Sequence, residues 1–123
     1  MLTLRITMVD YAPDDLYEQT PFDVDLLRKM PGFNRTDYWL AELRRPLRWK
    51  REGEELSVSH VLLAHRWVGQ EIQPGVRGIA VEIAFVTDTT LLEDEAFDHN
   101  KAAHVAIGLV EDVTEEVRRR LND

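Results

Sequence analysis

Apolar and polar residues alternate along several stretches of this chain, and that alternation predicts most of its secondary structure. Residues 2–8 and 79–86 alternate most regularly, as is typical of strands with one buried face. In these two stretches we expect these side chains to face inward: Leu2, Leu4, Ile6, Met8, Ile79, Val81, Ile83 and Phe85.

Three further strands are predicted over residues 38–49, 56–67 and 104–110. In the first, Trp39, Ala41 and Leu43 share one face, and in the last, Val105, Ile107 and Leu109 point inward. Pro46 cannot donate a hydrogen bond to a neighbouring strand, so the strand that contains it is either bulged there or lies at a sheet edge. Residues 50–55 include Gly53 and predict a hairpin turn.

Helices are predicted in three places. Thr20 followed by Pro21 resembles a helix start, and Phe22, Leu26 and Met30 then fall at helical spacing until Pro31. Residues 90–97 begin like a capping box, and residues 112–121 form a terminal helix with paired charges four residues apart. Residues 10–19 read as a loop, with a helical turn begun by Pro13.

This order of elements indicates one α+β domain over residues 1–123. We expect a curved, mainly antiparallel sheet of about five strands, with helices packed on one side. A small, partly open β-barrel is the alternative, because Pro46 and the change of apolar face within residues 56–67 both suggest strong curvature.

The composition limits the chemistry, the location and the partners that we expect of this protein. The 123 residues include no Cys, which excludes disulfides, thiolate catalysis and Cys-based zinc sites. We find neither a signal peptide nor a stretch apolar enough to span a membrane, and we therefore expect a cytoplasmic protein without membrane contact. The net charge of −8 disfavours nucleic acid as a partner of the whole domain.

The charges are segregated along the chain. Residues 10–25 and 88–98 are rich in Asp and Glu, whereas cationic residues gather near Trp49 at the end of the predicted central hairpin. Cations beside an aromatic ring can hold single-stranded nucleic acid, but they also protect an edge strand from aggregation. The cationic residues considered for binding are Arg44, Arg45 and Arg48.

The sequence offers two candidate chemical sites. His60 together with Glu82, which interrupts an apolar strand, would be a general base and its carboxylate partner if their strands were neighbours in register. Asp98, His99 and His104 would be a metal-ligand set if the loop folded back, although their spacing matches no specific motif. The chain has no nucleophile elbow, phosphate loop or dinucleotide fingerprint, and we expect no cofactor.

The three tryptophans, Trp39, Trp49 and Trp67, all fall on the predicted central hairpin. They either pack in the core or mark a binding surface. We therefore favour a non-enzymatic module that binds a protein partner or a second copy of itself, of which an immunity or antitoxin protein is one example. A small enzyme or ligand-binding domain that uses His60 and Glu82, and nucleic-acid contact by the basic hairpin, are the alternatives.

Overall fold

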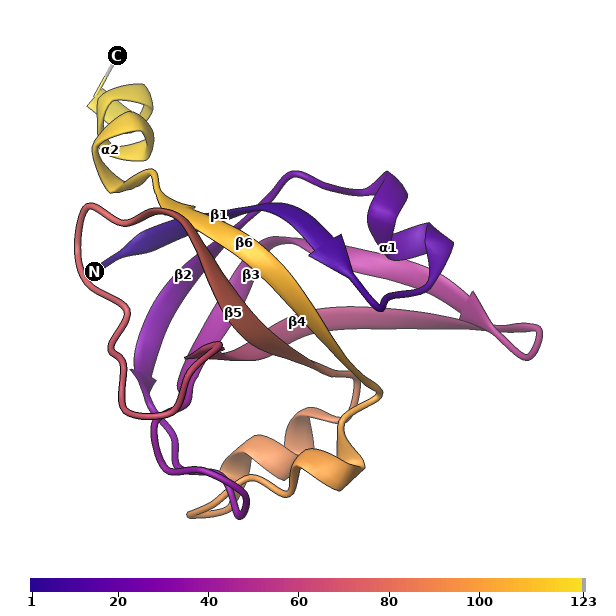
Figure 1. Cartoon of the computed structure of the whole chain (residues 1–123). Coiled ribbons are helices and arrows are strands. Elements are labelled where there is room, and N and C mark those ends of the chain that lie inside the picture. Colours follow the sequence, from indigo (N-terminus) through magenta and orange to yellow (C-terminus); the bar gives the residue numbers. More distant parts are fainter. Residues whose placement is uncertain (123) are drawn as a thin grey trace.

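The computed structural model describes residues 1–122 and shows a closed barrel of antiparallel strands (Figure 1). Each strand pairs with the next one along the chain, and the last strand pairs with the first, so the sheet has no free edge. The strands are β1 (Thr3–Asp10), β2 (Phe22–Lys29), β3 (Trp39–Arg51), β4 (Glu54–His65), β5 (Arg77–Val86) and β6 (His104–Asp112).

Helical structure is confined to the connections and the C-terminal end. The α-helices are α1 (Asp14–Glu18) and α2 (Thr114–Asn122), and two short 3-10 helices, η1 (Thr89–Glu93) and η2 (His99–Lys101), lie between β5 and β6. The Asp112 side chain accepts a hydrogen bond from the Thr114 amide at the start of α2. Within residues 1–122, neither α-helix has the length or apolar character needed to cross a bilayer.

Side chains fill the barrel, and both of its ends are closed by the chain itself. Leu16 of α1 is fully buried in the barrel core, at the end where β1 leads into β2. Ile72, from the connection between β4 and β5, is buried in the same core and closes the opposite end. Space for a ligand therefore has to be sought on the outer surface.

A second core covers part of the outside of the barrel. The segments 30–38 and 87–103 lie over the outer faces of β3, β4 and β5, and are joined to each other by a bridge between Gly32 and Phe97. The buried members of this cluster are Met30, Tyr38, Leu40, Leu62, Ala64, Ala84, Val86 and Phe97. Because β4 is covered on its outer face as well as its inner face, it carries apolar residues on both faces.

The structure corrects the helix predicted over residues 20–31, which is strand β2. Phe22 and Leu26 fit helical spacing, but they also fit the two-residue period of a strand, and Val24 between them is buried as well. Asp23 and Asp25 face outward, where they bind Arg5 and Thr3 of β1 instead of lying in the first turn of a helix.

The inward faces of β1 and β6 also differ from prediction. A bulge between Ile6 and Met8 shifts the register of β1 against β6, so Met8 is half exposed and Val9 is buried. In β6 the inward residues are Ala106, Gly108 and Val110, while Val105, Ile107 and Leu109 point outward.

The reason for the β6 difference is the space inside the barrel. A Cβ atom on Gly108 would lie 2.7 Å from the Cδ1 of Ile83 and 2.7 Å from the backbone oxygen of Met8. A side chain at position 108 therefore does not fit inside the barrel, and with Gly108 facing inward, the alternating residues Val105, Ile107 and Leu109 face outward.

The remaining expectations are met in part. The antiparallel sheet is confirmed, with six strands instead of about five, and the barrel alternative fits better than an open sheet flanked by helices. Of the two alternatives predicted at Pro46, a bulge or a sheet edge, the register shift between Glu42 and Leu47 shows the bulge. The inward face of β5 is as predicted. The helix predicted at residues 90–97 is η1 followed by irregular chain.

We predict that Leu16→Ala lowers the free energy of unfolding by about 2–5 kcal/mol, because it leaves a cavity where α1 closes the barrel. Urea denaturation measures the loss. The matched control is Glu18→Ala on the exposed side of the same helix, which should change stability by less than about 0.5 kcal/mol. Equal effects of the two substitutions would show that α1 does not close the core.

Candidate binding surfaces

The outer face of β6 carries a row of large apolar side chains, of which Val105 is exposed and Ile107 and Leu109 are partly exposed. Val105, Ile107 and Leu109 occupy successive outward positions, and the Val105 side chain is 38% exposed. The neighbouring β1 adds Met8, which stands directly opposite Leu109 and is 49% exposed. Contiguous apolar groups on a surface are uncommon unless another molecule binds there.

Two tyrosines extend this row toward α1. Tyr11 is 71% exposed, and its carbonyl oxygen accepts a hydrogen bond from the Nε2 of His104, at the start of β6. The Tyr17 hydroxyl donates to Asp10 over 3.0 Å, and Asp10 stands opposite Ile107. We call this surface the β6 face, comprising Met8, Asp10, Tyr11, Tyr17, Val105, Ile107 and Leu109.

Acidic groups flank the apolar row. In the cross-strand register, Ile107 lies between Asp10 of β1 and Glu82 of β5. Asp14 of α1 is exposed close to Tyr17, where it and Asp10 both contribute to raising the Tyr17 pKa above its usual value, chiefly through the hydrogen bond to Asp10. The β6 face therefore combines apolar and aromatic contact area with negative charge.

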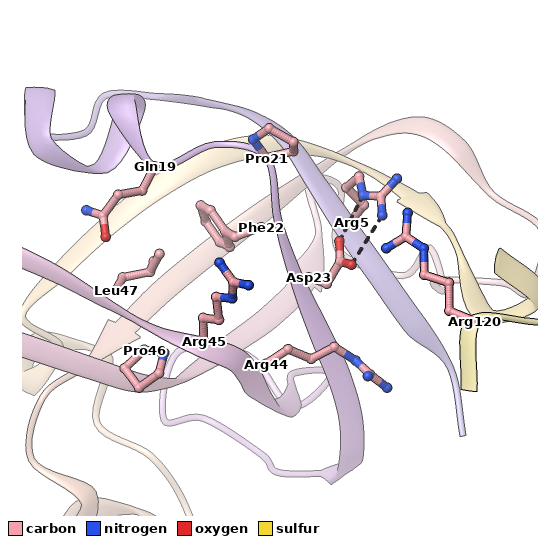
Figure 2. A pocket seen from close by; sticks show the side chains of 10 residues that line it. All are labelled: Arg5, Gln19, Pro21, Phe22, Asp23, Arg44, Arg45, Pro46, Leu47 and Arg120. Carbon is pink, nitrogen blue, oxygen red and sulfur yellow. Dashed lines mark hydrogen bonds and ion pairs between the residues drawn. The ribbon is translucent and has the colours of Figure 1, made fainter. Parts of the chain in front are cut away.

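A second candidate surface is an open groove of about 630 Å³ on the outside of β1, β2 and β3, next to α2 (Figure 2). Neighbouring residues of a regular strand point to opposite faces, but the bulge around Pro46 allows both Arg44 and Arg45 to line this groove. We call it the arginine groove, and its lining residues are Arg5, Gln19, Pro21, Phe22, Asp23, Arg44, Arg45, Pro46, Leu47 and Arg120.

Ion pairs fix one side of the arginine groove. The Arg5 guanidinium binds both carboxylate oxygens of Asp23, at 2.9 and 3.2 Å, and contacts Glu116 of α2 at 2.8 Å. The hydrogen bond to Asp23 is the main cause of a raised Arg5 pKa. Arg44 is held by Asp25 at 3.1 Å, and Arg120 binds Glu116 at 3.3 Å.

A buried polar cluster lies on the outer side of β5, beneath the segment 30–38. The fully buried Tyr38 hydroxyl donates to Glu82 and accepts a hydrogen bond from Asn34. Arg35 forms a bidentate pair with Asp37, with both nitrogen–oxygen distances at 2.6 Å, and its guanidinium lies 5.8 Å from the centre of the Tyr38 ring. This network fastens the segment to the barrel and engages the carboxylate of Glu82.

The structure does not bring His60 and Glu82 together. His60 stands opposite Val86 and Glu82 opposite Ala64, which separates the two residues by four positions, or about 13 Å, along the paired strands. The nearest polar neighbours of the His60 ring are Ser59, at 2.8 Å, and Glu42, at 3.9 Å.

Asp98, His99 and His104 are not arranged as metal ligands. Asp98 accepts from the amide of Asn100 at the start of η2, and His104 is engaged with Tyr11. Across residues 1–122, the structure contains no group of three or more His, Asp or Glu side chains placed to hold a metal ion.

The three tryptophans lie in different environments and do not form a joint surface. Trp49 is 3% exposed in the barrel core, where it meets the Phe85 ring edge-on at 6.1 Å. Trp39 is partly buried beneath the amine of Lys29, and Trp67 is 65% exposed in the connection between β4 and β5. Trp49 is therefore not available for base stacking beside Arg48, which pairs with Glu55 at 3.8 Å.

Several residues of these surfaces were missed in the sequence. Arg5, Phe22 and Arg120 reach the groove from elements far apart in the chain, and no local pattern links them. The interruption of an apolar strand by Glu82 did signal a special environment, but its partner, Tyr38, is 44 residues away.

Comparison with known proteins gives no further guide to function. Neither the family models, nor the curated proteins, nor the solved structures include a match to this chain.

We predict that Tyr38→Phe changes how stability depends on alkaline pH. Burial, followed by the hydrogen bond to Glu82, raises the pKa of Tyr38. Above pH 10 the unfolded chain loses this proton and the folded chain keeps it, so stability falls by up to about 1.4 kcal/mol per pH unit. Chemical denaturation between neutral pH and about pH 11 should show a shallower alkaline decline for Tyr38→Phe. Parallel profiles for the two proteins would contradict a buried, protonated Tyr38.

Proposed function

We propose that this chain is a non-enzymatic protein-interaction module that binds a basic and partly apolar segment of a partner protein through the β6 face. The observation that carries the proposal is the row of apolar side chains at the outward positions of β6, with Val105 38% exposed. The barrel interior has no room for a side chain at position 108, so Gly108 faces inward and this row faces outward.

The composition of the face supports a protein as the partner. Tyrosine and methionine are enriched at protein interfaces, because they offer a large contact area and, for tyrosine, a polar end. Tyr11, Tyr17 and Met8 surround the apolar row, and the hydrogen bond to Asp10 fixes the Tyr17 ring.

The charge around the face supports a basic segment in preference to a second copy of the chain. In a two-fold dimer that buried the β6 face, residues from the same patch would meet, bringing together the Asp10 carboxylates of two proteins of net charge −8. A cationic partner instead gains from these carboxylates, and Lys or Arg side chains can also stack on the tyrosine rings.

We predict that peptides selected from a random phage-displayed library by the intact protein combine Lys or Arg with large apolar residues. Their affinity should fall by at least about tenfold on Val105→Glu, which places a charge inside the apolar contact. Asp10→Asn should weaken binding by a few-fold, and added salt should weaken it further, because part of the attraction is between charges.

The matched control is Leu27→Glu, which introduces the same charge at a similarly exposed apolar residue on the outside of β2 and should leave the affinity unchanged. Thermal unfolding confirms that each variant is folded. Selection of acidic peptides, or equal binding by Val105→Glu and the original protein, would refute the proposal.

A further inference from the structure

We infer that the arginine groove is a binding site for a small organic anion, in which a phosphate monoester or carboxylate is attached to a flat apolar body. This site is separate from the β6 face and does not depend on the function proposed for it. The inference rests on an uncompensated arginine, an apolar wall and the shape of the groove.

Arg45 supplies the unused positive charge. Arg5, Arg44 and Arg120 each bind a carboxylate, whereas Arg45 makes no hydrogen bond or ion pair with any group in residues 1–122. Figure 2 shows its side chain extending from β3 toward Phe22, on the side of the groove away from Arg5 and Arg120. A guanidinium in this position can bind an oxyanion through two parallel hydrogen bonds.

The wall beside Arg45 is apolar. Phe22, Pro21, Pro46 and Leu47 line the groove next to it, and Phe22 and Leu47 are anchored in the barrel core. Phe22 and Leu47 are almost fully buried and form the base of this wall, whereas Pro21 and Pro46 are exposed. A flat apolar group can therefore pack on the two prolines while its anionic group meets Arg45. Gln19 closes this side of the groove. Its side-chain nitrogen donates to the backbone carbonyl of Arg48, and its side-chain oxygen accepts from the backbone amide of Arg48.

The other side of the groove adds weaker positive potential. Asp23 and Glu116 largely satisfy Arg5, but the Arg5 Nη1 has no partner among the described residues, and the exposed Arg120 keeps donors beyond its single bond to Glu116. Arg5, Arg44 and Arg120 are thus paired with Asp23, Asp25 and Glu116, and Arg45 supplies the positive charge of the groove that no carboxylate offsets among the described residues.

Size and charge favour a small anion over a nucleic acid. The volume of about 630 Å³ lies within the range of sites for small organic ligands, roughly 300–1,000 Å³. Nucleic acids gain most of their affinity from many phosphate contacts over a wide basic surface, whereas this protein is acidic overall and its cationic surplus is local to the groove.

The test is an NMR titration of the intact protein with four probes: phenyl phosphate, benzoate, inorganic phosphate and phenol. Phenyl phosphate and benzoate should both shift the backbone amides of residues 22–23 and 44–47 in a saturable way, since both join an oxyanion to a flat ring. Inorganic phosphate lacks the ring and phenol lacks the charge at neutral pH, so each should bind at least about tenfold more weakly. Tighter binding of phenyl phosphate than of benzoate assigns a phosphate ester, and the reverse order assigns a carboxylate.

Arg45→Ala should weaken the binding of phenyl phosphate by about tenfold or more, as expected when a charge-assisted hydrogen bond is removed. The matched control is Arg118→Ala, an arginine of α2 that pairs with Glu115 and does not line the groove, and it should leave the affinity unchanged. The inference is overturned if the shifts do not saturate, if phenol binds as well as phenyl phosphate, or if Arg45→Ala binds with the original affinity.

Discussion

The pairing of β6 with β1 is the constraint on which the rest of this structure depends. It closes the barrel and places the backbone of Met8 against Gly108, with Ile83 pressing on the same point from β5. A side chain has no room at this point, so Gly108 faces the core and Val105, Ile107 and Leu109, which alternate with it, face out. The apolar β6 face is thus a consequence of how the barrel is closed.

Local departures from regular strand geometry shape both surfaces. The bulge after Ile6 turns Met8 outward next to Leu109, and the bulge around Pro46 turns both Arg44 and Arg45 toward the same groove. Without these bulges, strict alternation would have returned Met8 to the core and separated the two arginines. Another part of the outside is covered by the chain itself, where Tyr38 and Glu82 fasten the segment 30–38 over the barrel.

The sequence predicts those parts of the fold where a local pattern of residues is compatible with only one kind of structure. The inward face of β5 and the bulge at Pro46 belong to this class, because regular alternation and a missing amide each have a local cause. The spacing of Phe22 and Leu26 satisfies a helix and a strand equally, and only pairing with β1 and β3 decides for the strand. Both faces of β6 carry apolar or small residues, so the sequence alone does not decide which face points inward. The space that Ile83 leaves at Gly108 decides it. The two surfaces were still harder to predict from the sequence, because the arginine groove brings together residues as far apart in the chain as Arg5 and Arg120.

The most direct test of this account is the accessibility of the β6 methyl groups to a soluble paramagnetic agent, measured by NMR on the isolated protein. The account predicts strong broadening of the Val105, Ile107 and Leu109 methyl signals, while those of Val110 and Ile83 remain protected in the barrel. Protected Val105 and Leu109 with a broadened Val110 would reverse the frame of β6 and contradict both the packing around Gly108 and the interaction surface drawn from it.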